Sequence, residues 1–162
     1  ALGSRQWQDG YPARADIDRD IARGYGYVFE KSDAAENPAA AETPQKYDKG
    51  TVPGGVIAYG AVVFDGEPAY GAIDGAWLTG GDYVVLHRLA VADGEKGRGV
   101  AAEFMRRTEA LARGRGVGSF RVDTNFDNRY MLRMLERLRF AYCGKIIYES
   151  GERLAFEKPF EA

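Results

Sequence analysis

The spacing of hydrophobic residues along the chain predicts a series of strands that ends in a hairpin. Residues 83–91 form a near-continuous apolar run of strand length, which is typical of the centre of a sheet. Residues 119–124 alternate between apolar and polar side chains, and we also expect strands over 25–30 and 56–64. The C-terminal residues 141–158 hold two alternating runs around the turn sequence ESGE, which predicts a β-hairpin.

Helical spacing separates the later strands. The stretch from Val100 to Arg113 brings one face together, made of Val100, Phe104, Met105, Thr108, Leu111 and Ala112. A second helix is expected after the capping sequence NFDN, with a buried stripe of Met131, Met134, Leu135 and Leu138. A short amphipathic helix is expected over residues 16–23. The resulting order indicates a mixed α/β domain and not a regular βαβ array.

The length of the chain fits one compact domain over residues 1–162. Residues 31–50 contain almost nothing to bury and carry two prolines, so we expect a mobile surface loop there and not a linker between domains. The chain has 21 glycines, and several of them gather between residues 94 and 118. This clustering predicts turns and close backbone approaches in that region.

Charge and cysteine content exclude several classes of protein. The net charge of −2 gives no overall attraction to nucleic acid or to an anionic membrane, and no apolar run approaches the ~20 residues of a membrane span. Cys143 is the only cysteine, which rules out an intrachain disulfide, and the sequence has no Cys/His cluster to hold a metal. We therefore expect a cytoplasmic protein without nucleic-acid, membrane or metal partners.

A glycine-rich, basic loop joins the long apolar strand to the first long helix, in the sequence EKGRGVAAEF. The first backbone N–H groups of a helix have no partner within the helix, and the helix dipole adds partial positive charge. Gly97 and Gly99 keep side chains out of the way, while Lys96 and Arg98 add full charges. These features predict a site for a phosphate or a pyrophosphate.

Two nucleotide ligands fit such a loop. The sequence GRGVAA at 97–102 matches the GxGxxA fingerprint of NAD(P)-binding oxidoreductases, and Asp123 at the end of the next strand is placed to bind the ribose. Against this reading, five residues separate the strand from the first glycine, whereas the turn in that fold is tight. The terminal hairpin also breaks the parallel strand order that the fold needs. Coenzyme A, which carries a pyrophosphate as well, is the other ligand.

The sequence KGRGVA resembles the Q/R-x-x-G-x-G/A pyrophosphate loop of the GNAT N-acetyltransferase superfamily, with Lys96, Gly99 and Ala101 at the motif positions. The sequences QWQDGYP, HRLAV and VDTNFDN also resemble this family, and the resemblance covers about residues 7–158. It implies an α/β (α+β) GNAT fold, with a mixed, mostly antiparallel central sheet that is splayed between the fourth and fifth strands, flanked by helices and closed by a C-terminal β-hairpin. The family starts with a strand and a helix, so we expect its first strand to be missing from this chain or disordered.

The resemblance further implies that acetyl-CoA is the cofactor and that its pantetheine arm enters the splay like an added strand. The expected contacts come from the strand, the loop and the start of the second long helix: Leu89, Ala90, Val91, Lys96, Gly97, Arg98, Gly99, Val100, Ala101, Asn125, Asn128 and Met131. Asn128 matches the asparagine of the family, and it is equally suited to capping the helix.

Transfer of an acetyl group to nitrogen needs an amine with a free lone pair. His87 is the only histidine, and an ordinary histidine with a pKa of about 6.5 suits a base at neutral pH. On a regular strand His87 shares a face with Val85 and Leu89. The N–H of Leu89 or Ala90 is the expected donor to the oxyanion. The alternative for His87 is the role of a satisfied core residue.

The family often protonates the departing thiolate with a tyrosine seven residues after the asparagine, a position that Leu135 takes here. We name Tyr142 as the candidate acid, beside Tyr130 and Cys143, or else water protonates the thiolate. Cys143 is better explained as a small buried residue than as a nucleophile, because the chain has no second histidine to activate it.

The candidate walls of an acceptor pocket are aromatic residues from irregular segments and one acid at a strand end: Trp7, Tyr11, Tyr70, Trp77, Tyr83 and Asp123. We expect an acetyl-CoA-dependent N-acetyltransferase that acts on a primary amine of a small molecule or peptide, by direct attack in a ternary complex. Homodimers are frequent in the superfamily, and the loop 31–50 is the expected gate of the acceptor site. The alternatives are a non-catalytic acyl-CoA sensor, which Leu135 favours, and an NAD(P)-binding oxidoreductase.

Overall fold

The computed structural model describes residues 10–31, 45–46 and 55–161. Its elements are α1 (Arg14–Arg23), β1 (Gly26–Glu30), β2 (Gln45–Lys46), β3 (Val56–Val63), the 3₁₀ helix η2 (Pro68–Ala72), β4 (Asp74–Gly75), β5 (Tyr83–Val91), the 3₁₀ helix η3 (Asp93–Glu95), α2 (Val100–Gly114), β6 (Ser119–Thr124), α3 (Arg129–Arg137), β7 (Ala141–Tyr148) and β8 (Gly151–Pro159). Trp7 and most of the predicted loop 31–50 lie outside the described residues, and because residues 1–9 do so too, the expected absence of the first strand of the family stays a prediction.

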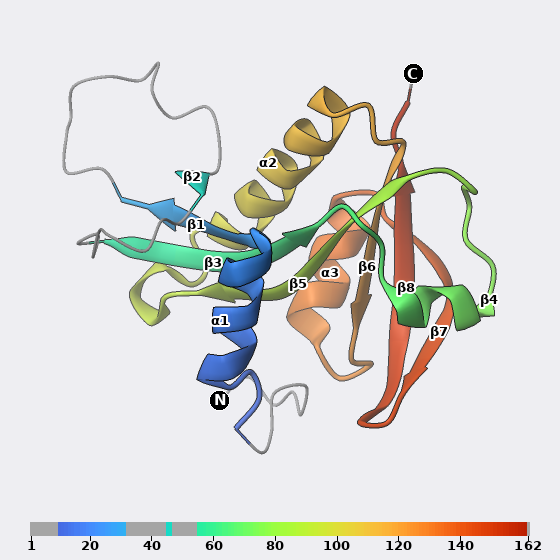
Figure 1. Cartoon of the computed structure of the whole chain (residues 1–162), viewed down its shortest axis with the longest axis horizontal. Helices are drawn as coiled ribbons and strands as arrows, with labels where there is room; N and C mark the ends of the chain where they lie inside the picture. The colour runs from blue at the N-terminus through green and yellow to red at the C-terminus, as the bar shows by residue number, and fades with distance from the viewer. Residues whose placement is uncertain (1–9, 32–44, 47–54, 162) are drawn as a thin grey trace.

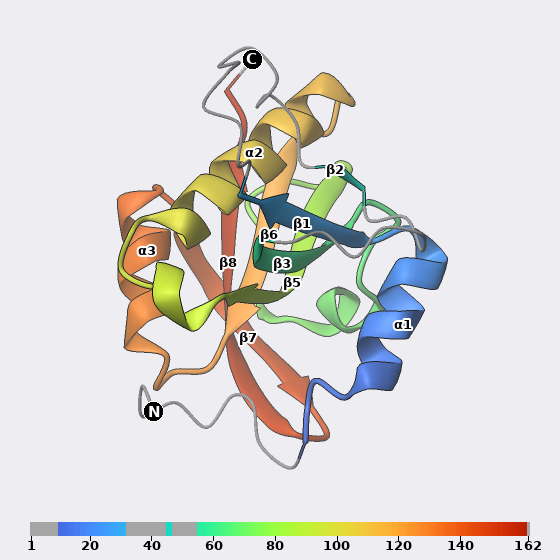
Figure 2. The same cartoon turned by 90° about the vertical axis from the view of Figure 1, so that its left-hand side faces the viewer.

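The described strands form one sheet in the order β2-β1-β3-β5-β6-β8-β7-β4. In this sheet β5 and β6 are the parallel pair, and the other neighbouring strands are antiparallel. Figures 1 and 2 together show α1 and η2 on one face, and α2 and α3 on the other. The predicted mixed sheet with a C-terminal hairpin is confirmed. The dinucleotide-binding fold needs a mostly parallel sheet, and these strands form a mostly antiparallel one. The sheet therefore does not support the alternative of an NAD(P)-binding oxidoreductase.

Most predicted elements lie where the hydrophobic pattern places them. The ranges of β5 and β6 are the predicted ones, and α2 ends one residue later than predicted. The helix α1 begins at Arg14, two residues earlier than expected, because the Asp16 carboxylate accepts a hydrogen bond from the N–H of Ala13 (2.8 Å) and caps the first turn. The strand β2 falls inside the predicted loop 31–50, where it pairs with β1 through backbone hydrogen bonds that need no apolar side chains.

The sheet opens between its two parallel strands, as predicted. The ladder between β5 and β6 joins only Tyr83, Val84 and Val85 to the start of β6, and beyond it the strands diverge. A β-bulge lies just after this point, since Ala61 of β3 pairs with His87 while Tyr59 pairs with Ala90. Two residues of β5 therefore oppose one residue of β3, which bends β5 away from β6.

The bulge changes which side chains share a face of β5. Arg88 has a φ of 54°, and Leu89 packs in the same core cluster as Val84 and Leu86. Val85 packs in the cluster on the other face of the sheet. The expectation that His87 and Leu89 share a face with Val85 is therefore wrong for Leu89, because the extra residue in the bulge shifts the alternation by one position.

Two hydrophobic clusters hold the sheet. The larger one lies under α2 and α3 and includes the predicted stripes, with Phe104, Met105, Met134 and Leu135 buried. Gly60 allows α2 to approach the sheet, because a Cβ there would lie 2.7 Å from the Phe104 ring. The second cluster, around Val63, Tyr70, Val85, Ile146 and Ala155, packs beneath η2. Within the described residues, no helix is long and apolar enough to cross a membrane.

A buried ion pair fixes the segment between β4 and β5 to the sheet. Glu157 on β8 is fully buried and lies 3.0 Å from Arg121 Nε on β6. Its carboxylate also accepts hydrogen bonds from the hydroxyls of Thr79 (2.6 Å) and Ser119 (2.7 Å) and from the N–H of Leu78 (2.5 Å). Burial raises the pKa of Glu157, but these donors outweigh it and leave the pKa below its ordinary value.

Candidate active site

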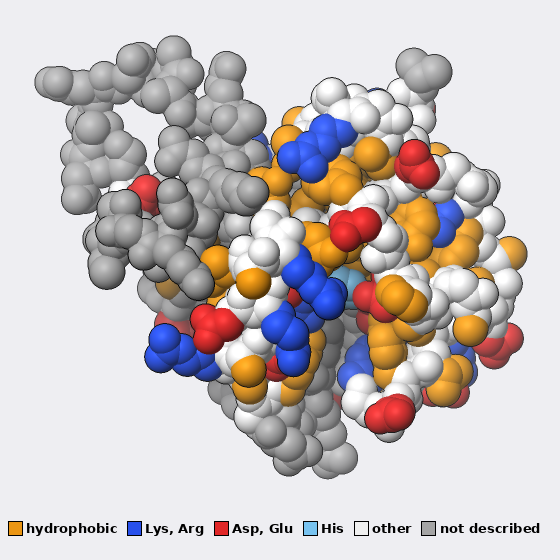
Figure 3. Space-filling model, in the orientation of Figure 1, with side chains coloured by type: hydrophobic (Ala, Val, Ile, Leu, Met, Phe, Trp, Pro, Cys, Tyr) orange, Lys and Arg blue, Asp and Glu red, His pale blue; other side chains and the backbone are white. Residues whose placement is uncertain are grey.

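A groove of about 1500 Å³ follows the opening between β5 and β6. One end is lined by the loop before α2, and the other by α1, the turn between β3 and η2, and the turn between β7 and β8. In Figure 3 the single imidazole lies in a hollow, with basic side chains beside α1 and an acidic side chain across from them. The groove therefore connects the predicted anion loop to the predicted base.

Two glycines in the left-handed region shape the loop before α2. Gly97 has a φ of 78° and Gly99 a φ of 82°, and a Cβ at either position would meet no atom within 4 Å outside its chain neighbours. The N–H of Glu103 makes its bond to the Gly99 carbonyl (3.0 Å), so the N–H groups of residues 100–102 point out of the helix end. This end of the groove is lined by Lys96, Gly97, Gly99, Val100 and Ala101. Backbone donors and the helix dipole together suit an anion here.

The two cations of the loop are each held by a neighbouring acid. The Lys96 ammonium donates to Asp93 (2.5 Å), and the Arg98 guanidinium lies 3.4 Å from Glu95. All of these pairs are solvent-accessible, so they stabilise the loop little and leave Lys96 free to turn toward a phosphate. Lys96 lines the groove, whereas Arg98 does not.

Asn128 caps α3 at the edge of the groove. Its side-chain oxygen accepts a hydrogen bond from the N–H of Met131 (3.2 Å), which is the capping role that the sequence left open. Asn128 and Met131 both line the groove, together with Leu89, Ala90 and Val91 from β5. The capping role therefore does not remove Asn128 from reach of a ligand.

The base predicted from the sequence has an acidic partner. His87 lines the groove, and its Nε2 lies 2.9 Å from the Glu67 carboxylate in the turn between β3 and η2. Glu67 is held by its own backbone and side chain, because its N–H donates to the Tyr83 hydroxyl (3.2 Å) and its carboxylate accepts from Ala69 N–H (3.1 Å). The hydrogen bond with His87 is the main reason why the pKa of Glu67 is lowered. Glu67 is therefore an ionised hydrogen-bond acceptor at neutral pH.

A second carboxylate, Asp123, lies at the end of β6 and lines the same groove. One of its oxygens accepts hydrogen bonds from the hydroxyls of Tyr70 (2.6 Å) and Tyr148 (3.4 Å). Burial, followed by the charge of Asp123, raises the pKa of both tyrosines, so they remain protonated donors. This arrangement holds Asp123 in the lining of the groove, to which His87 also belongs.

The residue in the bulge ties the groove to α1. Arg88 donates to both carboxylate oxygens of the buried Asp20 (2.5 and 2.7 Å) and to the hydroxyl of Tyr11 (3.1 Å). Asp20 also accepts from the hydroxyl of Tyr59 (2.8 Å). Burial lowers the pKa of Arg88, but these hydrogen bonds outweigh it and raise the pKa above its ordinary value. The wall formed by α1 is therefore held rigidly against β5.

Several predicted site residues lie away from the groove. Tyr142 on β7 is 56% exposed and its ring contacts Phe156, so the structure does not place it to protonate a thiolate in the splay. Tyr142 is not among the residues that line the groove, whereas Tyr148 at the other end of the same strand is. Trp77 and Tyr83 stack against the Arg121 guanidinium (4.5 and 3.9 Å) and pack in the core instead of lining the groove.

The remaining candidates for a general acid, for a cofactor contact and for the acceptor pocket differ in whether they line the groove. Leu135 has no acidic proton and is fully buried, and Cys143 is buried and does not line the groove, so neither is placed to protonate a thiolate there. Burial raises the pKa of the Cys143 thiol, which also disfavours its thiolate as a nucleophile. Tyr130 lines the groove at the start of α3. Asn125 is 8% exposed and is not part of the groove lining, whereas Tyr11 and Asp123 are.

Glu67 and Tyr148 line the groove and were not predicted from the sequence. Glu67 follows the turn signal DGEP, but an acid in a surface turn carries no sign of a partner 20 residues away. Tyr148 closes an alternating run at the hairpin turn, where tyrosine is common in any strand. Their roles arise from contacts between elements that lie far apart in the sequence.

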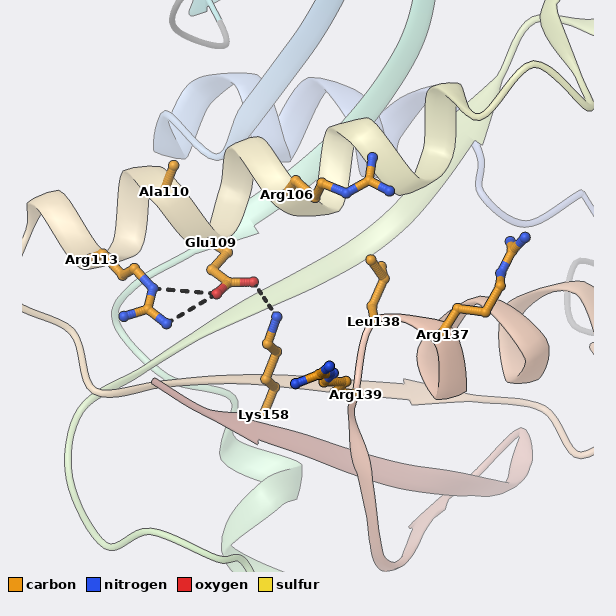
Figure 4. Close-up of a pocket in the computed structure, with 8 residues that line it drawn as sticks. All are labelled: Arg106, Glu109, Ala110, Arg113, Arg137, Leu138, Arg139 and Lys158. Atoms are coloured by element: carbon orange, nitrogen blue, oxygen red, sulfur yellow. Dashed lines mark hydrogen bonds and ion pairs between the residues drawn. The ribbon is translucent and has the colours of Figure 1, made fainter. Parts of the chain in front are cut away.

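A second depression lies away from the groove, between α2, the end of α3 and β8. It is lined by Arg106, Glu109, Ala110, Arg113, Arg137, Leu138, Arg139 and Lys158. Figure 4 shows Glu109 between Arg113 and Lys158, and Lys158 donates to it at 2.6 Å. This depression holds none of the residues predicted for the site.

The groove combines a helix start that suits an anion, a splayed sheet with unpaired strand edges, and a histidine. The sequence model of the Acetyltransferase (GNAT) family matches residues 8–140 of the chain. A comparison with curated proteins finds no match.

Solved structures agree with that family. An acetyltransferase of the GNAT family from Streptococcus agalactiae 2603 is 34% identical, with a TM-score of 0.76 over 99% of this chain and 81% of that one. A Bacillus subtilis acetyltransferase in complex with CoA has a TM-score of 0.61 at 10% identity, over 93% of this chain and 86% of that one. Arabidopsis thaliana NAA60 in complex with acetyl-CoA has a TM-score of 0.52 at 16% identity, over 67% and 68% of the two chains. The chain belongs to the GNAT acetyltransferase family.

Proposed function

We propose that the protein is an N-acetyltransferase that moves the acetyl group of acetyl-CoA to a primary amine by direct attack in a ternary complex. The observation that carries this proposal is the His87–Glu67 pair, which lies in the groove that also contains the glycine loop before α2. Acetyl-CoA is the acyl donor of the family to which the chain belongs. Within this proposal the homodimer and the cytoplasmic location stay predictions.

The residues present suit the parts of acetyl-CoA. The N–H groups at the start of α2 and Lys96 would hold the pyrophosphate. The unpaired ends of β5 and β6 offer backbone groups to the amides of the pantetheine arm, as an added strand would use them. Leu89, Ala90, Val91 and Met131 would enclose the arm, and the N–H of Leu89 or Ala90 would donate to the oxyanion.

His87 would take the proton of the amine through its Nδ1 atom. An ionised carboxylate can only accept hydrogen bonds, so the 2.9 Å contact with Glu67 places a proton on Nε2 of the neutral imidazole. Nδ1 is then the nitrogen with a free lone pair. Glu67 orients the ring and stabilises the positive charge that forms when Nδ1 accepts a proton.

Bound acetyl-CoA would supply the thioester carbon for the lone pair of the amine, so that a C–N bond would form as the C–S bond breaks. His87 would take the amine proton, and Tyr130 or water would protonate the departing thiolate. Tyr130 replaces Tyr142 as the candidate acid, because it lines the groove and Tyr142 does not.

Release of free coenzyme A thiol over a panel of primary amines tests this function. We expect turnover with at least one class of amine, and we expect His87→Gln to lower kcat by about a hundredfold or more while acetyl-CoA still binds. Arg133→Gln, at an exposed position of α3 outside the groove, is the control. Binding of acetyl-CoA without turnover of any amine would support the acyl-CoA sensor instead.

A further inference from the structure

The end of the groove away from the glycine loop is lined by both carboxylates and guanidiniums. We define the acceptor cup as the part of the groove formed by α1, the turn between β3 and η2, the turn between β7 and β8 with its flanking residues, and the neighbouring residues of β5 and β6. Its charged lining residues are Asp16, Arg19, Asp20, Arg23, Glu67, His87, Arg88, Asp123 and Arg153. The carboxylates and the guanidiniums of this set occupy different environments.

The carboxylates of the acceptor cup are engaged by protein donors. Glu67 is bound to His87, and Asp123 accepts from two tyrosine hydroxyls. Asp20 is buried beneath Arg88, and Asp16 pairs with Arg19. Glu67 is thus directed at the base, Asp16 and Asp20 are neutralised by guanidiniums, and Asp123 is held by neutral donors.

Among the described residues, two guanidiniums of the acceptor cup have no carboxylate counter-ion. Arg23, in the last turn of α1, interacts with the hydroxyl of Tyr25 and has no ion pair within the described residues. Arg153, at the start of β8, donates to the Ser150 hydroxyl (3.2 Å) and to the carbonyl of Glu152 (3.0 Å), and within the same residues it also has no ion pair. Both line the acceptor cup, Arg23 from α1 and Arg153 from β8.

The positions of Arg23 and Arg153 favour an acceptor that has an anionic group. A guanidinium offers a planar fork of donors that matches a carboxylate or a phosphate, and it repels a second ammonium group. A purely cationic polyamine would leave both guanidiniums unmatched. From these two guanidiniums, which have no ion pair within the described residues and line the same groove as the His87–Glu67 pair, we infer that the acceptor is an amine that also bears an anionic group, a carboxylate or a phosphate. This inference rests on the proposed function, because it names the substrate class of the same groove.

Matched acceptors test the inference. L-amino acids are compared with their carboxamides, and O-phosphoethanolamine with ethanolamine, by the release of free thiol. We expect the anionic member of at least one pair to have a kcat/KM at least about tenfold higher, since a charge-assisted hydrogen bond is worth about that factor. The pair that shows the preference identifies the anion as a carboxylate or a phosphate.

Variants connect the preference to the two arginines. Arg23→Gln and Arg153→Gln are expected to raise KM for the anionic acceptor and leave kcat and the neutral acceptor nearly unchanged. Arg133→Gln, an exposed arginine of α3 outside the groove, is the matched control and should change nothing. An equal kcat/KM for anionic and neutral acceptors, or a preference that survives both substitutions, would overturn the inference.

Binding of the acetylated product separates this inference from the proposed function. N-acetyl-L-amino acids and their carboxamides, and N-acetylated O-phosphoethanolamine and ethanolamine, are titrated into the protein saturated with coenzyme A. We expect tighter binding of an anionic member, and loss of that difference in Arg23→Gln. If no amine is acetylated but this difference persists, the proposed function fails and the inference on the anion stands. If turnover occurs but no anionic product binds more tightly, the inference fails and the function stands.

Discussion

At the scale of single residues, the site depends on contacts that fix the direction of polar groups. Nε2 of His87 is occupied by Glu67, and Glu67 is itself held by the Tyr83 hydroxyl and by Ala69 N–H. The imidazole therefore has one nitrogen, Nδ1, left to accept a proton. A histidine without such a partner would distribute its proton between both nitrogens, and less of it would be in the form that accepts a proton from the amine.

The first prediction tests whether Glu67 contributes to catalysis by acting through His87 or independently of it. We expect Glu67→Gln to lower kcat about tenfold or more, with little change in the affinity for acetyl-CoA, because the charge that stabilises the imidazolium is lost. In the background of His87→Gln, the same substitution should have almost no further effect on kcat. Equal effects of Glu67→Gln on kcat in both backgrounds would show that Glu67 does not act through His87.

The second prediction concerns the buried ion pair between Glu157 and Arg121. We expect Glu157→Gln to lower the free energy of unfolding by about 3 kcal/mol at pH 7, because it leaves the Arg121 charge buried without its partner. Urea unfolding measures this change. A loss below about 1 kcal/mol would indicate that the pair contributes little to stability.

Acid pH should lower the free energy of unfolding of the wild type more than that of Glu157→Gln. The pKa of Glu157 is lower in the folded protein than its ordinary value of 4.5, so its contribution is fully present above that pH and is lost as the pH falls through the folded pKa. The difference in free energy of unfolding between wild type and Glu157→Gln should therefore shrink below about pH 4.5. A difference that stays constant from pH 7 to pH 3 would contradict the assigned sign.

At the scale of elements, the bulge in β5 and the short parallel ladder create the groove. The register shift places Arg88 and Leu89 opposite one residue of β3, so β5 turns away from β6 after Val85. Gly60 on β3 lies at this point and lets Phe104 of α2 pack against the sheet. The helix start that carries the glycine loop is positioned by the same contact.

The third prediction tests this close approach. We expect Gly60→Ala to lower the free energy of unfolding by about 1–3 kcal/mol, because the added methyl group would lie 2.7 Å from the Phe104 ring and 2.8 Å from the Leu86 side chain. Gly71→Ala, where a Cβ meets no atom within 4 Å, is the matched control and should leave the midpoint of thermal unfolding nearly unchanged. Equal midpoints for the two variants would show that the space at Gly60 is not limiting.

At the scale of the whole molecule, sequence patterns predicted the long strands, both long helices, the hairpin and the glycine loop. These features follow from local periodicity and from residue types such as Gly97 and Gly99, whose conformations the loop needs. The bulge at Arg88 has no such local sign, because its side chains are compatible with a regular strand. The partner of His87, the tyrosines around Asp123 and the outward position of Tyr142 depend on how distant elements pack, which a single sequence does not encode in short spacings.

The measurement that tests the central claim most directly is a calorimetric titration of acetyl-CoA into the wild type, Gly99→Glu and Gly116→Glu. Gly116 also has a positive φ (73°) and open space around its Cβ, but it lies outside the groove, so it controls for strain and charge. The account predicts micromolar binding to the wild type and to Gly116→Glu, and no binding to Gly99→Glu. Absence of binding to the wild type, or equal affinity for all three proteins, would contradict the assignment of the loop to the pyrophosphate of acetyl-CoA.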